Sequence, residues 1–74
     1  MMTNTVLLNK TIKESGVKRY SLAEQLGLTY QGLLNKINNV SEFKASEIKK
    51  LSEILGIDHE LRERIFFEGG SIND

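Results

Sequence analysis

The stretch that most constrains the fold is SLAEQLGLTYQGLLNKIN, residues 21–38. It contains two short amphipathic segments that flank Gly27, and each has apolar residues at helical spacing. Two short helices joined by three or four residues that include a glycine are typical of a helix-turn-helix. The apolar positions that define the two segments are Leu22, Ala23, Leu26, Leu33 and Ile37.

The residues between the two segments predict a sharp turn. Gly27 lies where the backbone must change direction, and we expect it to adopt a positive φ, which glycine tolerates without strain. Leu28 should fill the angle between the helices, and Thr29 is a good N-cap for the second one. Ala23 is small enough to let the second helix cross closely.

The rest of the chain extends this pattern to five helices and no strands. We expect helices over about 4–15, 19–26, 30–37, 45–55 and 59–67, because glycines or asparagines end most of these segments. Asn4 or Thr5 should cap the first and Asp58 the last, while the second begins near Arg19 with a weak cap. Phe43 anchors the loop before the fourth helix.

Length and composition favour one small all-α domain, residues 1–74, with an ordered core of about 4–67. Residues 1–3 and the polar tail, residues 69–74, are expected to be loose and flexible. There is no cysteine, so neither a disulfide nor a thiolate metal site can stabilise the fold. The chain lacks a membrane-spanning apolar run and a signal pattern, so we expect a soluble intracellular protein without a membrane partner.

The charges are distributed unevenly along the chain, although the net charge is zero. Residues 1–40 carry five basic and two acidic residues, a net charge of +3, and residues 41–74 carry −3. The basic excess therefore coincides with the predicted helix-turn-helix, which mildly favours a nucleic-acid partner.

The segment LAEQLGLTYQGLLNKINN resembles the helix-turn-helix of the phage repressor and Cro-type family of DNA-binding proteins. The similarity consists of the LA pair, a leucine three residues after the alanine, the adjacent glycine, an apolar residue, the threonine cap and the NKINN ending. It extends from about residue 8 to residue 67. Lys18 and Arg19 depart from the family pattern, which has a capping Ser or Thr and often a Gln at these positions.

The resemblance implies a compact five-helix, lambda-repressor-like domain that binds double-stranded DNA and regulates transcription, most simply as a repressor. It also implies a bacterial cytoplasmic protein of phage origin. The third helix would enter the major groove, where base edges differ in donors, acceptors and the thymine methyl. If Leu33 and Ile37 face the core, four side chains face outward as base contacts: Tyr30, Gln31, Leu34 and Asn35.

Backbone phosphates should position this helix. Thr29 and the free N–H groups that follow it present a helix N-terminus to an anion. By resemblance, Arg19 occupies a position that contacts the DNA backbone. The remaining phosphate candidates flank the groove and are Lys36, Asn38, Asn39 and Lys44.

A single copy should bind weakly, so we expect a weak homodimer on a pseudo-palindrome. Phe66 and Phe67 are the candidate dimer contacts, because adjacent helical residues point about 100° apart and one ring should be difficult to bury. Alternatively, the helix ends at Ile65 and both rings pack inside.

Other functions have less support in the sequence. A protein-interaction module of the same fold, antirepressor-like or antitoxin-like, is the main alternative, and the weak basicity is compatible with it. An enzyme is not expected, because His59 is the only histidine and the glycines are scattered, most of them at segment ends, rather than grouped in a phosphate-binding loop. We expect no cofactor, metal or small-molecule ligand, and no room for a separate effector domain.

Overall fold

The structure is a computed structural model that describes residues 2–68, and all the regular structure in this range is helical. Each observed helix lies within one residue of its expected bounds, which confirms the all-α prediction. Met1 and the tail, residues 69–74, lie outside the described residues, and with them the expectation that the tail is flexible. The five helices are α1 (Thr5–Ser15), α2 (Arg19–Gln25), α3 (Tyr30–Ile37), α4 (Ala45–Leu55) and α5 (His59–Phe66).

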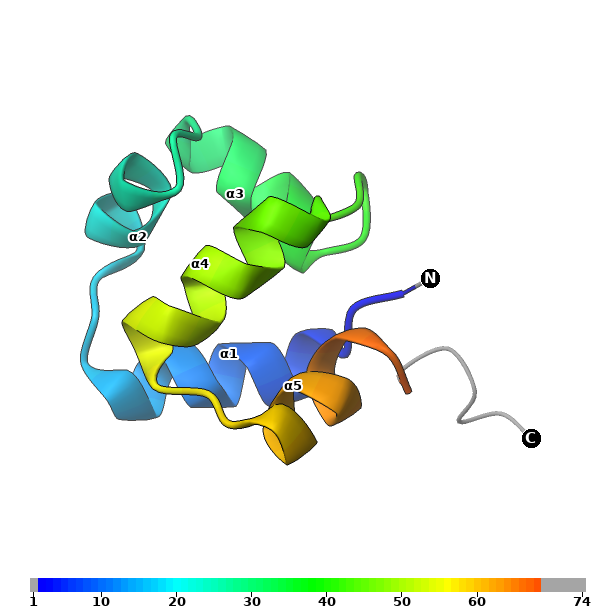
Figure 1. The fold of residues 1–74 in the computed structure, drawn as a ribbon. Coiled ribbons are helices and arrows are strands. Elements are labelled where there is room, and N and C mark those ends of the chain that lie inside the picture. The colour runs from blue at the N-terminus through cyan, green and yellow to red at the C-terminus, as the bar shows by residue number, and fades with distance from the viewer. Residues whose placement is uncertain (1, 69–74) are drawn as a thin grey trace.

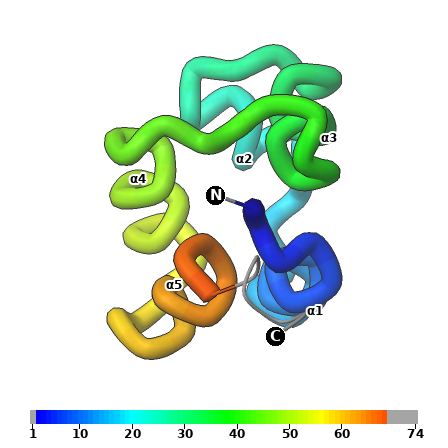
Figure 2. The backbone as a smooth tube through the Cα atoms, turned by 90° about the vertical axis from the view of Figure 1, so that its right-hand side faces the viewer, coloured from blue at the N-terminus to red at the C-terminus, as the bar shows by residue number. Residues whose placement is uncertain are grey.

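The five helices pack around one core. Figure 1 shows α2 and α3 together at one end, α1 and α5 at the other, and α4 running between the two ends. Figure 2, turned by 90°, shows α1 and α3 on one side of the molecule and α4 and α5 on the opposite side.

The core takes apolar residues from every helix, at the spacings that the sequence indicates. Phe43, from the loop before α4, also lies in it and meets the ring of Phe66 edge-on, with centroids 5.5 Å apart. Burial of these side chains is the main stabilising contribution in a chain this small. The buried apolar residues are Leu8, Ile12, Leu22, Ala23, Leu33, Ile37, Phe43, Ile48, Leu51, Ile65 and Phe66.

Local signals end and begin the helices as expected. The side chain of Asn4 accepts a hydrogen bond from Leu7 N at 3.1 Å and that of Asp58 from Leu61 N at 2.9 Å, so both cap the following helix. Lys18 makes no side-chain cap bond to α2, in line with the weak start expected there. Asn39 ends α3 with a φ of 66°.

The expectation that residues 1–3 are loose is wrong for Thr3. Its side chain is buried, its N–H donates to Asn39 Oδ1 at 2.8 Å, and its carbonyl accepts from Asn39 Nδ2 at 2.9 Å. The next residue, Asn4, donates its N–H to the carbonyl of Ile65 in α5 at 2.6 Å. The N-terminal segment is thus held between the end of α3 and the end of α5 by contacts across more than 30 residues.

Between residues 2 and 68, no helix is both long and apolar enough to cross a membrane.

Candidate nucleic-acid interface

The turn between α2 and α3 is set by local backbone chemistry. Gly27 has a φ of 73°, the left-handed conformation that the sequence predicts. Leu28 N–H then donates back to the carbonyl of Ala23 at 2.9 Å, and the Leu28 side chain packs partly buried against the core. Thr29 Oγ1 accepts from Gly32 N at 2.9 Å and caps α3. These bonds fix how the start of α3 leaves α2.

The structure explains why the residue at position 32, inside α3, is a glycine, which the sequence did not reveal. A Cβ at this position would lie 2.9 Å from Thr29 Oγ1, closer than side-chain carbons normally approach. In the structure, Gly32 leaves room for the capping hydroxyl.

The outward face of α3 carries a coupled pair of amides. Leu33 and Ile37 are buried, so the residues between them turn away from the core. Gln31 Nε2 donates to Asn35 Oδ1 at 2.9 Å, one helical turn apart on the exposed face. Leu34 is partly buried beside them. This pair still has the carbonyl oxygen of Gln31 as an acceptor and N–H groups of Asn35 as donors.

Tyr30 contacts another tyrosine that the sequence analysis missed. Its ring stacks on that of Tyr20 in α2, with centroids 4.2 Å apart and planes 15° from parallel. Tyr20 is 73% exposed, so the stack lies at the surface where α2 and α3 begin. Ten residues separate the two rings in the sequence, and helical periodicity within one segment gives no signal for a contact across the turn.

Arg19 is held at the start of α2 by a residue from α1. Its Nη2 donates to Asn9 Oδ1 at 2.7 Å, and the guanidinium keeps further N–H donors. Asn38 and Lys44 are exposed, beyond the C-terminus of α3 and at the start of α4 respectively. Thr29 and Asn38 lie at the two ends of α3.

Two of the expected phosphate contacts have hydrogen-bond or ion-pair partners within the protein. Asn39 uses its amide to hold Thr3, as described above. Lys36 Nζ lies 2.6 Å from Glu47 Oε1 in α4, and both side chains are nearly nine-tenths buried. The same Oε1 accepts from Lys44 N at 2.8 Å. Lys36 therefore joins α3 to α4 in the structure.

The environment of Glu47 shifts its ionisation. Burial disfavours the carboxylate and by itself would raise its pKa. The hydrogen bonds from Lys36 and from the Lys44 backbone, together with the positive charges of both lysines, outweigh burial and hold the pKa of Glu47 below its ordinary value. The ion pair is thus intact at neutral pH.

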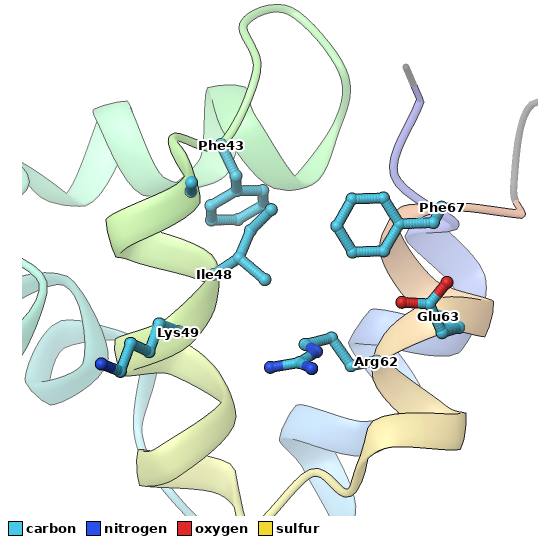
Figure 3. Close-up of a pocket in the computed structure, with 7 residues that line it drawn as sticks. Phe43, Ile48, Lys49, Arg62, Glu63 and Phe67 are labelled. Atoms are coloured by element: carbon cyan, nitrogen blue, oxygen red, sulfur yellow. The ribbon is translucent and has the colours of Figure 1, made fainter.

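The two phenylalanines at the end of α5 have different surroundings. Phe66 lies in the core, whereas Phe67 is 47% exposed. Of the two candidate dimer contacts, the structure therefore leaves only Phe67 exposed at the surface. Phe67 lines a cavity of about 270 Å³ between α4 and α5, together with Phe43 and Ile48 (Figure 3). Arg62 extends from α5 toward α4 at one end of this cavity.

Within residues 2–68, no three His, Cys, Asp or Glu side chains come together as metal ligands. His59 is exposed at the start of α5, where its Nδ1 lies 3.2 Å from Arg62 Nη2.

Comparison of the chain with protein-family models, characterised proteins and solved structures found no match.

Proposed function

We propose that the protein is a sequence-specific DNA-binding regulator of transcription that inserts α3 into the major groove. The observation that carries this proposal is the Gln31–Asn35 amide pair, on the exposed face of a short helix with a capped N-terminus after a tight glycine turn. The resemblance to phage repressor and Cro-type proteins supports the same assignment, and adds repression in a bacterial cytoplasm as the expected role.

The amide pair has the polarity that an adenine edge requires. Adenine presents an acceptor, N7, and a donor, N6, in the major groove. The carbonyl oxygen of Gln31 can accept from N6 while an N–H of Asn35 donates to N7, with the hydrogen bond between the two amides retained. Leu34, beside the pair, can contact a thymine methyl, and Tyr30 offers a hydroxyl to a base or a phosphate.

Phosphate contacts would hold α3 in register. Arg19 reaches the backbone from the start of α2, and the free N–H groups after Thr29 favour an anion at the start of α3. Asn38 and Lys44 would flank the far side of the groove. Lys36 and Asn39 are less suited to this role, because their polar groups are engaged by Glu47 and Thr3.

We expect binding as a weak homodimer on half-sites about 34 Å apart. The contact between copies would include Phe67 and the cavity between α4 and α5. Figure 2 shows these two helices on the side of the molecule opposite α3. An exposed aromatic ring beside an apolar cavity contributes about 1–3 kcal/mol when it is covered.

The same surface supports a second candidate function. A half-exposed phenylalanine beside a cavity lined by Phe43 and Ile48 suits a protein partner, and the net charge of zero gives little general attraction to DNA. On this alternative the chain is a protein-interaction module, antirepressor-like or antitoxin-like, that does not bind DNA itself.

Selection of duplexes from a randomised pool tests the proposal without knowledge of the operator. The protein should enrich a related set of sequences, and its affinity should fall as salt rises. Gln31→Ala should relax preference at one base position, whereas Arg19→Ala should weaken enriched and random duplexes about equally. No enrichment, with no salt-dependent binding, would reject the DNA-binding function and favour the protein-interaction module.

A further inference from the structure

A second basic feature lies outside the α3 face, in a shallow groove between α1 and the start of α2. Its basic side chains are Lys10 and Lys13 from α1 and Arg19 from α2. Ile12 and Val17 contribute apolar lining. We call this the α1–α2 basic groove. Three cations from two helices thus surround one depression, and no acidic residue lines it.

The helix that supplies most of the groove, α1, lies on the same side of the molecule as α3, the helix proposed to contact DNA. Figure 2 shows α1 and α3 on the same side, opposite α4 and α5. Arg19 joins the two regions, because it begins the helix that leads through the turn into α3, while its Nη2 is bonded to Asn9 of α1 at 2.7 Å. A duplex held against α3 and Arg19 would therefore extend past α1.

The three cations differ in how they are held. Asn9 orients the guanidinium of Arg19, which still has N–H donors for an anion. Lys10 and Lys13 are exposed, and residues three apart on a helix have Cβ atoms about 5–6 Å apart. Their ammonium groups are free to reach successive anionic groups along an extended polyanion, rather than to enclose one small anion.

We propose that the α1–α2 basic groove binds backbone phosphates of duplex DNA beyond the base pairs that α3 contacts. Lys10 and Lys13 supply sequence-independent contacts, and Asn9 is a positioning residue for Arg19. This inference rests on the proposed DNA-binding function. It lengthens the stretch of one DNA strand that the protein contacts. Because phosphate contacts release counterions, the groove adds affinity and salt dependence without adding base preference.

The test compares three proteins on one selected duplex over a fourfold range of salt. They are wild type, the Lys10→Ala/Lys13→Ala double variant and a control, Lys50→Ala/Arg64→Ala, in which two exposed cations of α4 and α5 are removed. Affinity falls as salt rises, and in the double variant this fall should be less steep. The magnitude of the slope of log affinity against log salt should decrease by about 1.8, since each phosphate contact contributes about 0.9. Over the fourfold salt range, the double variant should therefore lose roughly tenfold less affinity than wild type.

A shortened duplex makes the test local. If base pairs are removed from the flank beside α1, wild type should fall to the affinity and slope of the double variant, and the double variant should not change. An Asn9→Ala substitution should reduce affinity only when Arg19 is present, which a double-mutant cycle measures.

The outcomes separate this inference from the proposed function. If a specific duplex is enriched but the double variant keeps the wild-type slope, the phosphate-binding role of the groove is rejected and the DNA-binding function stands. An equal slope change in the control would show a general charge effect and would also reject the role of the groove. Wild type without salt-dependent binding to any duplex would overturn both.

Discussion

The ion pair between α3 and α4 provides the sharpest stability prediction. In Glu47→Gln, the ammonium of Lys36 keeps its position but faces a neutral amide, and the Lys44 backbone N–H also loses its charged acceptor. The two side chains are 12% and 11% exposed. A partly buried charged hydrogen bond of this kind contributes about 2 kcal/mol, less than the roughly 3–5 kcal/mol lost when a fully buried pair is broken.

That loss is large for a chain of this size. A domain of 74 residues has a free energy of unfolding of about 4–11 kcal/mol. For Glu47→Gln we expect the melting temperature at neutral pH to fall by roughly 8–16 °C, measured by circular dichroism. The matched control is Glu53→Gln, an exposed residue of the same helix, which should change stability by less than about 0.5 kcal/mol.

The pH dependence has a definite sign. Because the pKa of Glu47 is lowered in the folded protein, its stabilising effect is present above the ordinary pKa of 4.5 and is lost as pH falls through the folded value. The difference in stability between wild type and Glu47→Gln should therefore shrink below about pH 4.5. A melting temperature within 2 °C of wild type at neutral pH, or a difference that persists in acid, would refute this reasoning.

Three further predictions concern the turn, the amide pair and the end of α5. Gly27→Val should destabilise by about 1–3 kcal/mol in chemical denaturation, because a β-branched residue is strained at a φ of 73°; an unchanged midpoint would contradict it. Gln31→Ala or Asn35→Ala should keep the fold but cost about 1–3 kcal/mol on a selected duplex; equal weakening on random DNA would argue against base contact. Phe66→Ala should cost about 3–5 kcal/mol of stability, because its ring is buried. Phe67→Ala should leave the fold intact and weaken self-association in sedimentation. A Phe67→Ala protein that associates like wild type would place the dimer contact elsewhere.

In the part of the chain that the structure describes, the all-α architecture with five helices is confirmed. The turn at Gly27, the cap at Thr29 and the burial of Leu33 agree with the sequence prediction. The DNA-binding role is the proposal that the exposed face of α3 supports, and the duplex selection decides it. The structure narrows the phosphate candidates, because Lys36 and Asn39 have partners within the protein.

The sequence by itself determined the features that depend on neighbouring residues. Helical periodicity, side-chain caps such as Asn4 and Asp58, and the left-handed glycine at position 27 act within a few residues, so they are visible in the order of amino acids. The same local geometry indicated that one of the two rings, Phe66 or Phe67, would be difficult to bury, and the structure leaves Phe67 exposed.

Only the tertiary structure decided which side chains meet across the fold. The Lys36–Glu47 pair, the clamp of Thr3 by Asn39 and the stack of Tyr20 on Tyr30 join residues that no periodic pattern links. Each depends on the angle and distance between packed elements, which the whole core sets at once. For that reason the sequence could nominate Lys36 and Asn39 as surface contacts, while the folded chain engages both in its own packing.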